Sequence, residues 1–250
     1  MSGPGASTKL IYYDFSLDKA GHHVRQRLAG WDAGPDPKYL QADAASNNDE
    51  LYKQRPKIRE VGCWAHARRK FFDIAKLSPA AQTAHGALHR INALFDIERQ
   101  AKEGVLDGDD LIAWRAEHAK PKLDALHAWL KDELRQIQPK TPTAGAIGYA
   151  LKHWQALTRY LDHAHCSIDN NAAERALRVV AQGRKNWLVA GSENGGTAAA
   201  VAYTLIESAK ACGHTPREYL HDLLQRLPTT LNKDIDQLLP HRWTPASTSA

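Results

Sequence analysis

A change in hydrophobic periodicity near residue 66 divides this 250-residue sequence into stretches with different structural requirements. Before that point, runs of aromatic and β-branched residues predict strands at residues 9–16, 38–43 and 57–64. The segments between these runs have helical spacing. Because strands that alternate with helices usually build a sheet covered by helices, the first third predicts an α/β arrangement.

From residue 66 to 165 the apolar residues recur every three or four positions, which is the spacing of helices that face a core. The first apolar stripe begins at Ala84, and the dipeptide Ser78-Pro79 before it predicts an N-cap followed by the first helical residue. We therefore expect a mainly helical α/β protein whose sheet is interrupted by an all-helical insertion.

The end of the chain has its own signals. Thr215-Pro216 predicts a second helix start, with Glu218 completing a capping box. The last residues, 244–250, are small and polar, and we expect them to be disordered.

Composition limits the location and the partners of the chain. No apolar run approaches the roughly 20 residues of a membrane helix, and the first residues lack the basic and apolar regions of a signal peptide, so we expect a cytoplasmic protein. Its three cysteines are widely spaced, which predicts reduced thiols. A formal charge of +5 suits a polyanionic partner without requiring one.

Two carboxylates stand where ligand sites tend to form. Asp43 follows a predicted buried strand, at the carboxyl edge of the sheet, although a turn aspartate there is a simpler interpretation. Glu174 lies three residues after Asn171 at a predicted helix start, where the pair would form a capping box. Alternatively, Asp43 and Glu174 together could hold Mg²⁺ for phosphoryl transfer, because Mg²⁺ prefers hard oxygen ligands.

A possible zinc site is a third candidate. Cys63 and His66 have the spacing of half a tetrahedral site, and the segment around His165 and Cys166 could supply the other half. The chain has 13 histidines, so chance pairs are expected. We favour an ordinary buried cysteine and a hydrogen-bonded histidine over zinc.

Basic residues gather in three clusters. Each cluster by itself is typical of a solvated face. Their position around Glu174, with a tryptophan beside the last cluster, instead suggests phosphate contacts and a stacking platform for bases. The candidate DNA-binding residues are Arg68, Arg69, Lys70, Arg175, Arg178, Arg184, Lys185 and Trp187.

Four segments together resemble the transposases of the insertion-sequence-66 family, from about residue 10 to Trp243. They are "VGCWAHARRKFFDIAK", "SIDNNAAERALR", "GRKNWLVAGS" and "YTLIESAKACGHTPREYL". The resemblance implies an Asp-Asp-Glu transposase, which uses a ribonuclease-H-like sheet, two Mg²⁺ ions and three carboxylates to cut and rejoin DNA ends. It assigns the second catalytic aspartate to Asp43 and the catalytic glutamate to Glu174, and it matches the family's Cys-x₂-His signature at Cys63 and His66.

The resemblance also implies a division of the chain and two departures from the family pattern. The loop after Asp43 lacks the glycine and aromatic residues that family members have there. The family's first aspartate, on a strand upstream of residues 9–16, has no counterpart, so we expect a core truncated at the N-terminus. The expected parts are a partial core at 8–65, a helical insertion at 66–165, the return of the core at 166–212 and a C-terminal helical segment at 213–243.

We therefore expect a Mg²⁺-dependent transposase that acts on DNA, either as a homo-oligomer or with a complementary N-terminal transposase chain. The alternative from another class is a catalytically inactive DNA-binding or assembly fragment of a split or degenerate transposase. A zinc-stabilised helical interaction module is a third interpretation, which depends on Cys63, His66, His165 and Cys166 alone.

Overall fold

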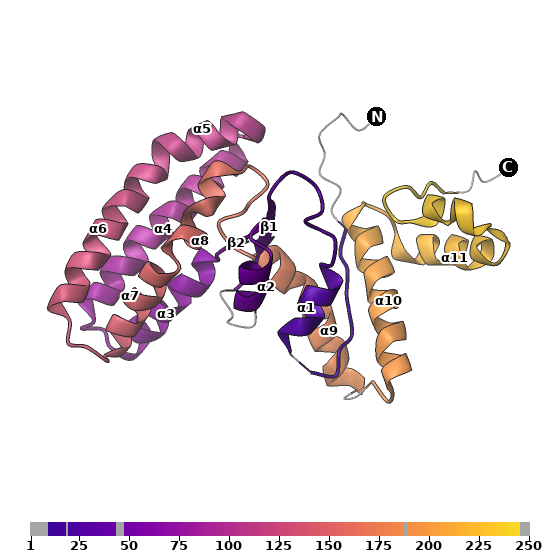
Figure 1. The fold of residues 1–250 in the computed structure, drawn as a ribbon, viewed down its shortest axis with the longest axis horizontal. Coiled ribbons are helices and arrows are strands. Elements are labelled where there is room, and N and C mark those ends of the chain that lie inside the picture. The colour runs from indigo at the N-terminus through magenta and orange to yellow at the C-terminus, as the bar shows by residue number, and fades with distance from the viewer. Residues whose placement is uncertain (1–9, 19, 44–47, 188–189, 246–250) are drawn as a thin grey trace. The chain divides into compact units, whose positions relative to one another are not determined.

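The computed structural model describes residues 10–18, 20–43, 48–187 and 190–245 (Figure 1). The chain divides into a larger unit, Ala20–Ala172, and a smaller unit made of Met1–Lys19 and Ala173–Ala250. None of the helices in the described ranges has both the length and the apolar composition that a membrane crossing requires. From residue 246 onward, the tail that we expect to be disordered lies outside the described residues.

The larger unit contains a two-stranded parallel sheet. Strand β1 (Lys38–Gln41) pairs with β2 (Ile58–Val61) from Lys38 opposite Ile58 to Gln41 opposite Val61. Parallel neighbours need a crossover connection, and helix α2 (Asp49–Gln54) lies in it, with its buried Leu51 covering the sheet. Both strands and the helix between them agree with the sequence prediction.

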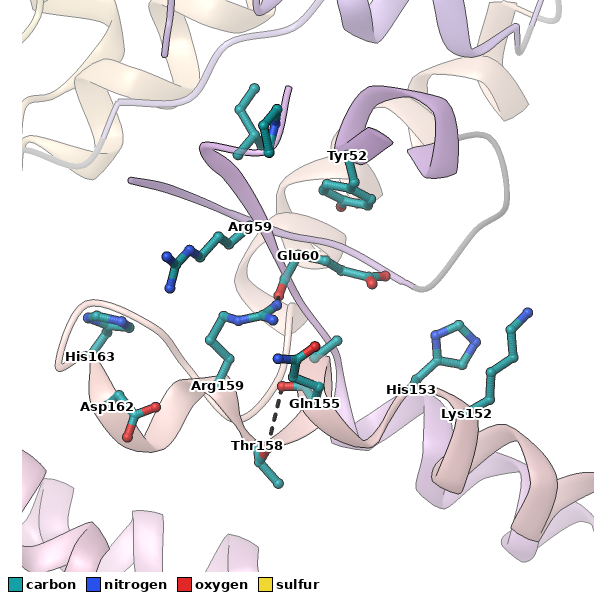
Figure 2. Close-up of a pocket in the computed structure, with 13 residues that line it drawn as sticks. Tyr52, Arg59, Glu60, Lys152, His153, Gln155, Thr158, Arg159, Asp162 and His163 are labelled. Atoms are coloured by element: carbon teal, nitrogen blue, oxygen red, sulfur yellow. Dashed lines mark hydrogen bonds between the residues drawn. The ribbon is translucent and has the colours of Figure 1, made fainter. Parts of the chain in front are cut away.

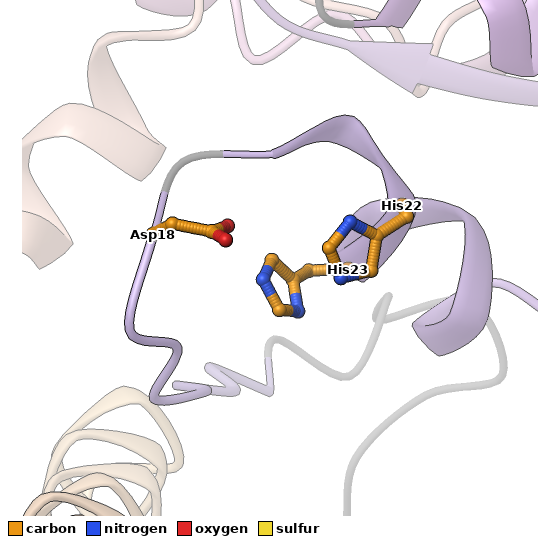
Figure 3. Close-up of side chains that lie close together, drawn as sticks. All are labelled: Asp18, His22 and His23. Atoms are coloured by element: carbon orange, nitrogen blue, oxygen red, sulfur yellow. The ribbon is translucent and has the colours of Figure 1, made fainter.

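Helix α1 (Gly21–Arg27) precedes the sheet and also agrees with the predicted helical spacing. It begins with His22 and His23, whose ring centroids are 3.9 Å apart (Figure 3). Asp18, drawn in the same figure, belongs to the smaller unit. The guanidinium of Arg55, at the end of α2, donates to the carbonyl oxygen of Leu28 at 2.7 Å, which ties the end of α1 to α2.

A helical bundle forms the rest of the larger unit. Figure 1 shows its long helices lying alongside one another, and they pack through a continuous apolar core around Trp64, Ile91, Leu126 and Ile147. The helices are α3 (Trp64–Leu77), α4 (Gln82–Glu103), α5 (Gly108–His118), α6 (Lys120–Gln136), α7 (Pro142–Lys152), α8 (Trp154–Thr158) and the 3-10 helix η2 (Arg159–Asp162). The helical prediction for residues 66–165 therefore holds.

One predicted helix start is wrong. Ser78 does not cap α4; it ends α3, where its N–H donates to the carbonyl oxygen of Ile74 at 3.0 Å and its backbone is extended. The physical reason is Pro79, whose ring disfavours the helical conformation for the residue before it. Helix α4 begins only at Gln82.

The smaller unit contains helices α9 (Asn171–Trp187, from Ala173 onward), α10 (Glu193–Ala211) and α11 (Pro216–Arg226), followed by the 3-10 helices η3 (Leu227–Thr229) and η4 (Asn232–Leu238). Its C-terminal core surrounds Trp243, which packs edge-on against Tyr219 and donates to a carboxylate oxygen of Asp222 at 2.6 Å. Helix α11 starts at Pro216 after Thr215, as predicted, although the Thr215 side chain forms no capping bond.

Residues 10–16 differ from their prediction as a strand. They are extended, but they pair with no strand in the described part of the chain. The N–H groups of Ile11 and Tyr13 donate instead to the hydroxyls of Ser208 and Thr204 on α10, at 3.0 and 2.9 Å. The alternating sequence is thus satisfied by side chains of one helix rather than by a neighbouring strand.

Candidate active site

Asp43 stands at the carboxyl edge of the sheet, as predicted. The N–H of Ala42 donates to the carbonyl oxygen of Val61 at 3.2 Å, so the chain is still held to β2 directly before Asp43. The Asp43 side chain is exposed, and within the described residues no hydrogen bond or ion pair engages it. Its carboxylate is therefore available to a ligand. The altered loop predicted after it, residues 44–47, lies outside the described residues.

The segment that leads into α9 lies at the same edge of the sheet. The side-chain amide of Gln41 donates to the carbonyl oxygen of Ser167 at 2.5 Å and accepts from the N–H of Ser167 at 3.2 Å. The N–H of Trp64 donates to the carbonyl oxygen of Ile168 at 3.0 Å. Contacts to the ends of both strands thus hold residues 167–168 in place within the larger unit.

The start of α9 is capped in a different way from the prediction. Helix α9 begins at Asn171, so Asn171 is its first residue rather than its cap. Asp169 supplies the capping carboxylate, because its two oxygens accept from the backbone N–H of Asn171 at 3.0 Å and from its side-chain amide at 2.6 Å. The end of α9 that precedes Glu174 is therefore fixed by a carboxylate that the sequence interpretation did not use.

Glu174 lies in the first turn of α9 and is half-buried. A carboxylate in the first turn is favoured by the helix dipole. Among the predicted DNA-binding residues on this helix, Arg175, Arg178 and Lys185 are exposed, whereas the side chains of Arg184 and Trp187 lie outside what the structure describes. The exposed cations of α9 are available to an anionic partner.

The basic cluster on α3 is partly occupied by contacts inside the bundle. Arg68 donates to the side-chain oxygen of Asn92 at 2.7 Å, and the ammonium of Lys70 lies 4.5 Å from the ring centroid of Tyr149. Arg69 is exposed. Of these three, Arg69 is thus the residue whose geometry best suits a phosphate contact.

Cys63 and His66 do not gather with the other predicted zinc ligands. Among the described residues, no three ligand atoms from Cys63, His66, His163, His165 and Cys166 lie within 4.8 Å of one another. Cys63 is buried directly before α3, and its sulfur accepts from the N–H of Asn170 at 3.5 Å. Burial raises the pKa of the Cys63 thiol. These contacts describe a structural thiol that links α3 to the segment before α9.

A polar pocket of about 670 Å³ lies beside β2 in the larger unit (Figure 2). Burial, and then the charge of Asp49, raise the pKa of the Glu60 carboxyl in its wall, while Arg159 and Lys152 lower it. Tyr52 also lines this pocket, and its buried hydroxyl has no hydrogen-bond partner in the described residues. The charged residues of the pocket are Arg59, Glu60, Lys152, Arg159 and Asp162, with His153 and His163 beside them.

Sequence reasoning missed Gln41, Asp169 and this pocket. Gln41 stands two residues before Asp43 in a motif that drew notice only for its aspartate. Asp169 had a usable signal, since aspartate shortly before a helix is a common cap. The pocket had none, because it joins residues of β2 to residues about a hundred positions later.

The residue types at the sheet edge fit a hard divalent cation. Asp43 and Glu174 would contribute carboxylate oxygens, which are the ligands that Mg²⁺ prefers. Two carboxylates do not complete the coordination of two ions, so a further oxygen ligand is needed.

Comparison with known proteins places the chain in a class and then in a family. Residues 1–198 match the family described as "Transposase IS66 family", and residues 204–241 match "IS66 C-terminal element". These matches define a transposase-type chain over nearly its whole length. The protein belongs to the IS66 transposase family, as the sequence motifs predicted.

Its curated relatives are named only as uncharacterized proteins. In Sinorhizobium fredii, y4hP is 34% identical over 98% of this chain and 46% of its own length, and y4qI is 34% identical over 96% and 44%. The chain therefore spans about half the length of the curated relatives it matches. No solved structure matches it.

Proposed function

We propose that this chain takes part in cutting and joining the DNA ends of an insertion sequence, with Asp43 and Glu174 as metal-binding carboxylates. The supporting observation is the link between Gln41 and Ser167, which holds the strand before Asp43 next to the segment before α9. Glu174 follows one turn into that helix. In the complete site both carboxylates would face the same ions.

In this proposal β1 and β2 belong to a ribonuclease-H-like core, formed by residues 8–65 and 166–212. Residues 66–165 are an insertion into that core, and residues 213–243 form a separate C-terminal segment. The parallel pairing of the two strands and the return of Ile168 to Trp64 support this arrangement. The outer edge of β1 pairs with no other strand in the described residues, so further strands could add there.

The proposed chemistry is displacement at phosphorus. Bound Mg²⁺ would activate the attacking oxygen and stabilise the leaving oxygen. Water attacks a phosphodiester and releases a 3′-hydroxyl, which then attacks a phosphodiester of the target DNA and joins the two strands. Asp43 and Glu174 hold the ions, and the cations Arg184 and Lys185 hold DNA phosphates. The protein would act as a homo-oligomer or with a chain that supplies further strands.

One observation favours a second function. The family resemblance assigns two of the three required carboxylates to this chain, and the third has no counterpart among its residues. Without a third carboxylate, the chain would bind DNA or assemble with other transposase chains but would not cleave by itself.

Strand cleavage of IS66-type DNA ends in Mg²⁺ tests this proposal. We expect no cleavage by the chain alone, and Mg²⁺-dependent nicking when it is mixed with a polypeptide that supplies the third carboxylate on strands able to pair with β1. Replacing Glu174 with Gln should abolish the nicking and leave DNA binding nearly intact, because it removes a metal ligand with little change in shape. Cleavage by the chain alone that Glu174→Gln stops would mean that another carboxylate, with Asp14 the first to test, completes the site.

A further inference from the structure

The pocket beside β2 contains cations that are not neutralised by ion pairs. Arg59 and Lys152 both line it, and neither has an ion-pair or hydrogen-bond partner within the described residues. Arg159 uses one guanidinium nitrogen to donate to the carbonyl oxygen of Glu60, and its other nitrogens have no such partner there. The pocket therefore has several N–H donors with unused capacity.

The charge balance of the pocket is positive. Three permanent cations, Arg59, Lys152 and Arg159, line it together with two carboxylates, those of Glu60 and Asp162. Positive charge is also felt by His153, because burial and then the charges of Lys152 and Lys70 lower the pKa of its imidazole, although Asp49 opposes them. A cation would meet repulsion in such a pocket, whereas an anion would be attracted.

The cations are spread along the pocket and are held in place. Figure 2 shows Arg59 and His163 toward one end, Lys152 and His153 toward the other, and Arg159 between them. The ring of His163 packs against Tyr39 with centroids 4.0 Å apart, and the bond from Arg159 to the backbone of β2 fixes its side chain. Donors positioned before the ligand arrives lose less conformational entropy on binding.

We propose that this pocket binds phosphate groups of the DNA backbone, an inference that rests on the proposed function. Arginine and lysine are the residues that most often hold phosphates, and a planar guanidinium can donate two bonds to one phosphate. The volume of about 670 Å³ exceeds what one phosphate fills, so a stretch of sugar-phosphate backbone fits better than an isolated ion. Contacts of this kind orient DNA without reading its sequence.

The test compares two pairs of substitutions in the full chain by fluorescence anisotropy with labelled DNA. The pocket pair is Arg59→Gln with Lys152→Gln, and the control pair is Lys102→Gln with Lys131→Gln, at exposed positions on α4 and α6. Both pairs remove two positive charges. We expect the pocket pair to weaken binding about tenfold or more and to reduce the salt slope by about two units, and the control pair to change little.

A second arm distinguishes DNA from free phosphate. Inorganic pyrophosphate, titrated into the wild-type chain, should shift the NMR signals of His153 and His163 weakly, should compete with DNA, and should not shift them in the pocket pair. Tight pyrophosphate binding without any effect of the pocket pair on DNA affinity would overturn the assignment to DNA. Should the pocket pair fail to fold, Lys152→Gln against Lys102→Gln makes the same comparison at an exposed helix end.

The outcomes separate this inference from the proposed function. Equal DNA binding by the pocket pair and the control pair would overturn the pocket assignment and leave the proposed function standing. Failure of the wild-type chain to bind any DNA would overturn both. A loss of binding confined to the pocket pair supports the pocket whether or not the chain cleaves.

Discussion

Gln41 and Ser167 are joined by two hydrogen bonds, one in each direction, between a side-chain amide and a backbone peptide group. Gln41 is the last residue of β1, and Ser167 lies four residues before the start of α9. A side-chain amide that bonds both groups of one residue substitutes for a bridge between strands. This contact connects the strand that leads to Asp43 with the segment that leads to Glu174.

Replacing Gln41 with Ala should release the segment before α9. We expect the free energy of unfolding to fall by about 1–2 kcal/mol, because two hydrogen bonds are lost at a partly exposed site. The amide of Ser167 should also exchange its hydrogen faster, which NMR can follow residue by residue. Gln54→Ala is the control, since Gln54 bonds only to exposed Glu50 one turn away. Unchanged exchange at Ser167 would contradict the structural role given to Gln41.

Arg115 and Glu98 form a buried ion pair that should dominate the stability of the bundle. Arg115 is 2% exposed, donates to both carboxylate oxygens of Glu98 at 2.8 and 2.6 Å, and also bonds the carbonyl oxygen of Tyr160 at 2.7 Å. Glu98→Gln should lower the free energy of unfolding by about 3–5 kcal/mol, because it leaves a buried cation without its counter-charge. Urea unfolding measures the loss.

The control for this prediction is an exposed pair on the same helix. Arg99 lies 2.9 Å from Asp96, and both side chains are more than half exposed. Asp96→Asn should cost less than about 1 kcal/mol. Equal losses for Glu98→Gln and Asp96→Asn would show that burial of Arg115 does not set the energy.

The sequence predicted the elements of this fold better than their partners. Period-two runs located β1 and β2, and helical periodicity located the bundle, because burial of one face leaves a pattern in local sequence. Residues 10–16 have the same period-two pattern, yet they lie on α10. Periodicity reports that one face of a segment is covered, and it does not report whether a strand or a helix covers it.

The candidate site was predicted in part for a similar reason. Asp43 and Glu174 were found because each stands at the end or the start of an element and within a family motif. Gln41 and Asp169, which hold the segment before Glu174, act through backbone contacts that leave no spacing pattern in the sequence. The pocket beside β2 depends on a tertiary contact between Glu60 and Arg159, which local sequence does not encode.

Cys63 should behave as a structural thiol. Replacing Cys63 with Ser should lower the free energy of unfolding by ~1 kcal/mol or more, because a hydroxyl loses more than a thiol on burial. Its raised pKa keeps the thiol protonated at neutral pH, so iodoacetamide should label it only after unfolding. Stoichiometric zinc in the native protein, lost on Cys63→Ser, would instead support a metal site.

Arg184 and Lys185 should contact DNA phosphates. Changing both to Ala should weaken binding of all DNA sequences alike and reduce the salt slope by roughly two units, since each phosphate contact releases counterions. Anisotropy titrations at several salt concentrations give the slope. An unchanged slope would exclude these two residues from the DNA interface.

Binding of Mn²⁺, a paramagnetic substitute for Mg²⁺ at carboxylate sites, tests most directly whether Asp43 and Glu174 share a metal site. The measurement is a double-mutant cycle by calorimetry or electron paramagnetic resonance, with Asp43→Asn, Glu174→Gln and both together, and with Asp73→Asn at an exposed position of α3 as the control. We predict that each single change weakens binding strongly, that the double change adds little further loss, and that the control has no effect. Losses that add independently, or Mn²⁺ binding that ignores both carboxylates, would contradict a shared site.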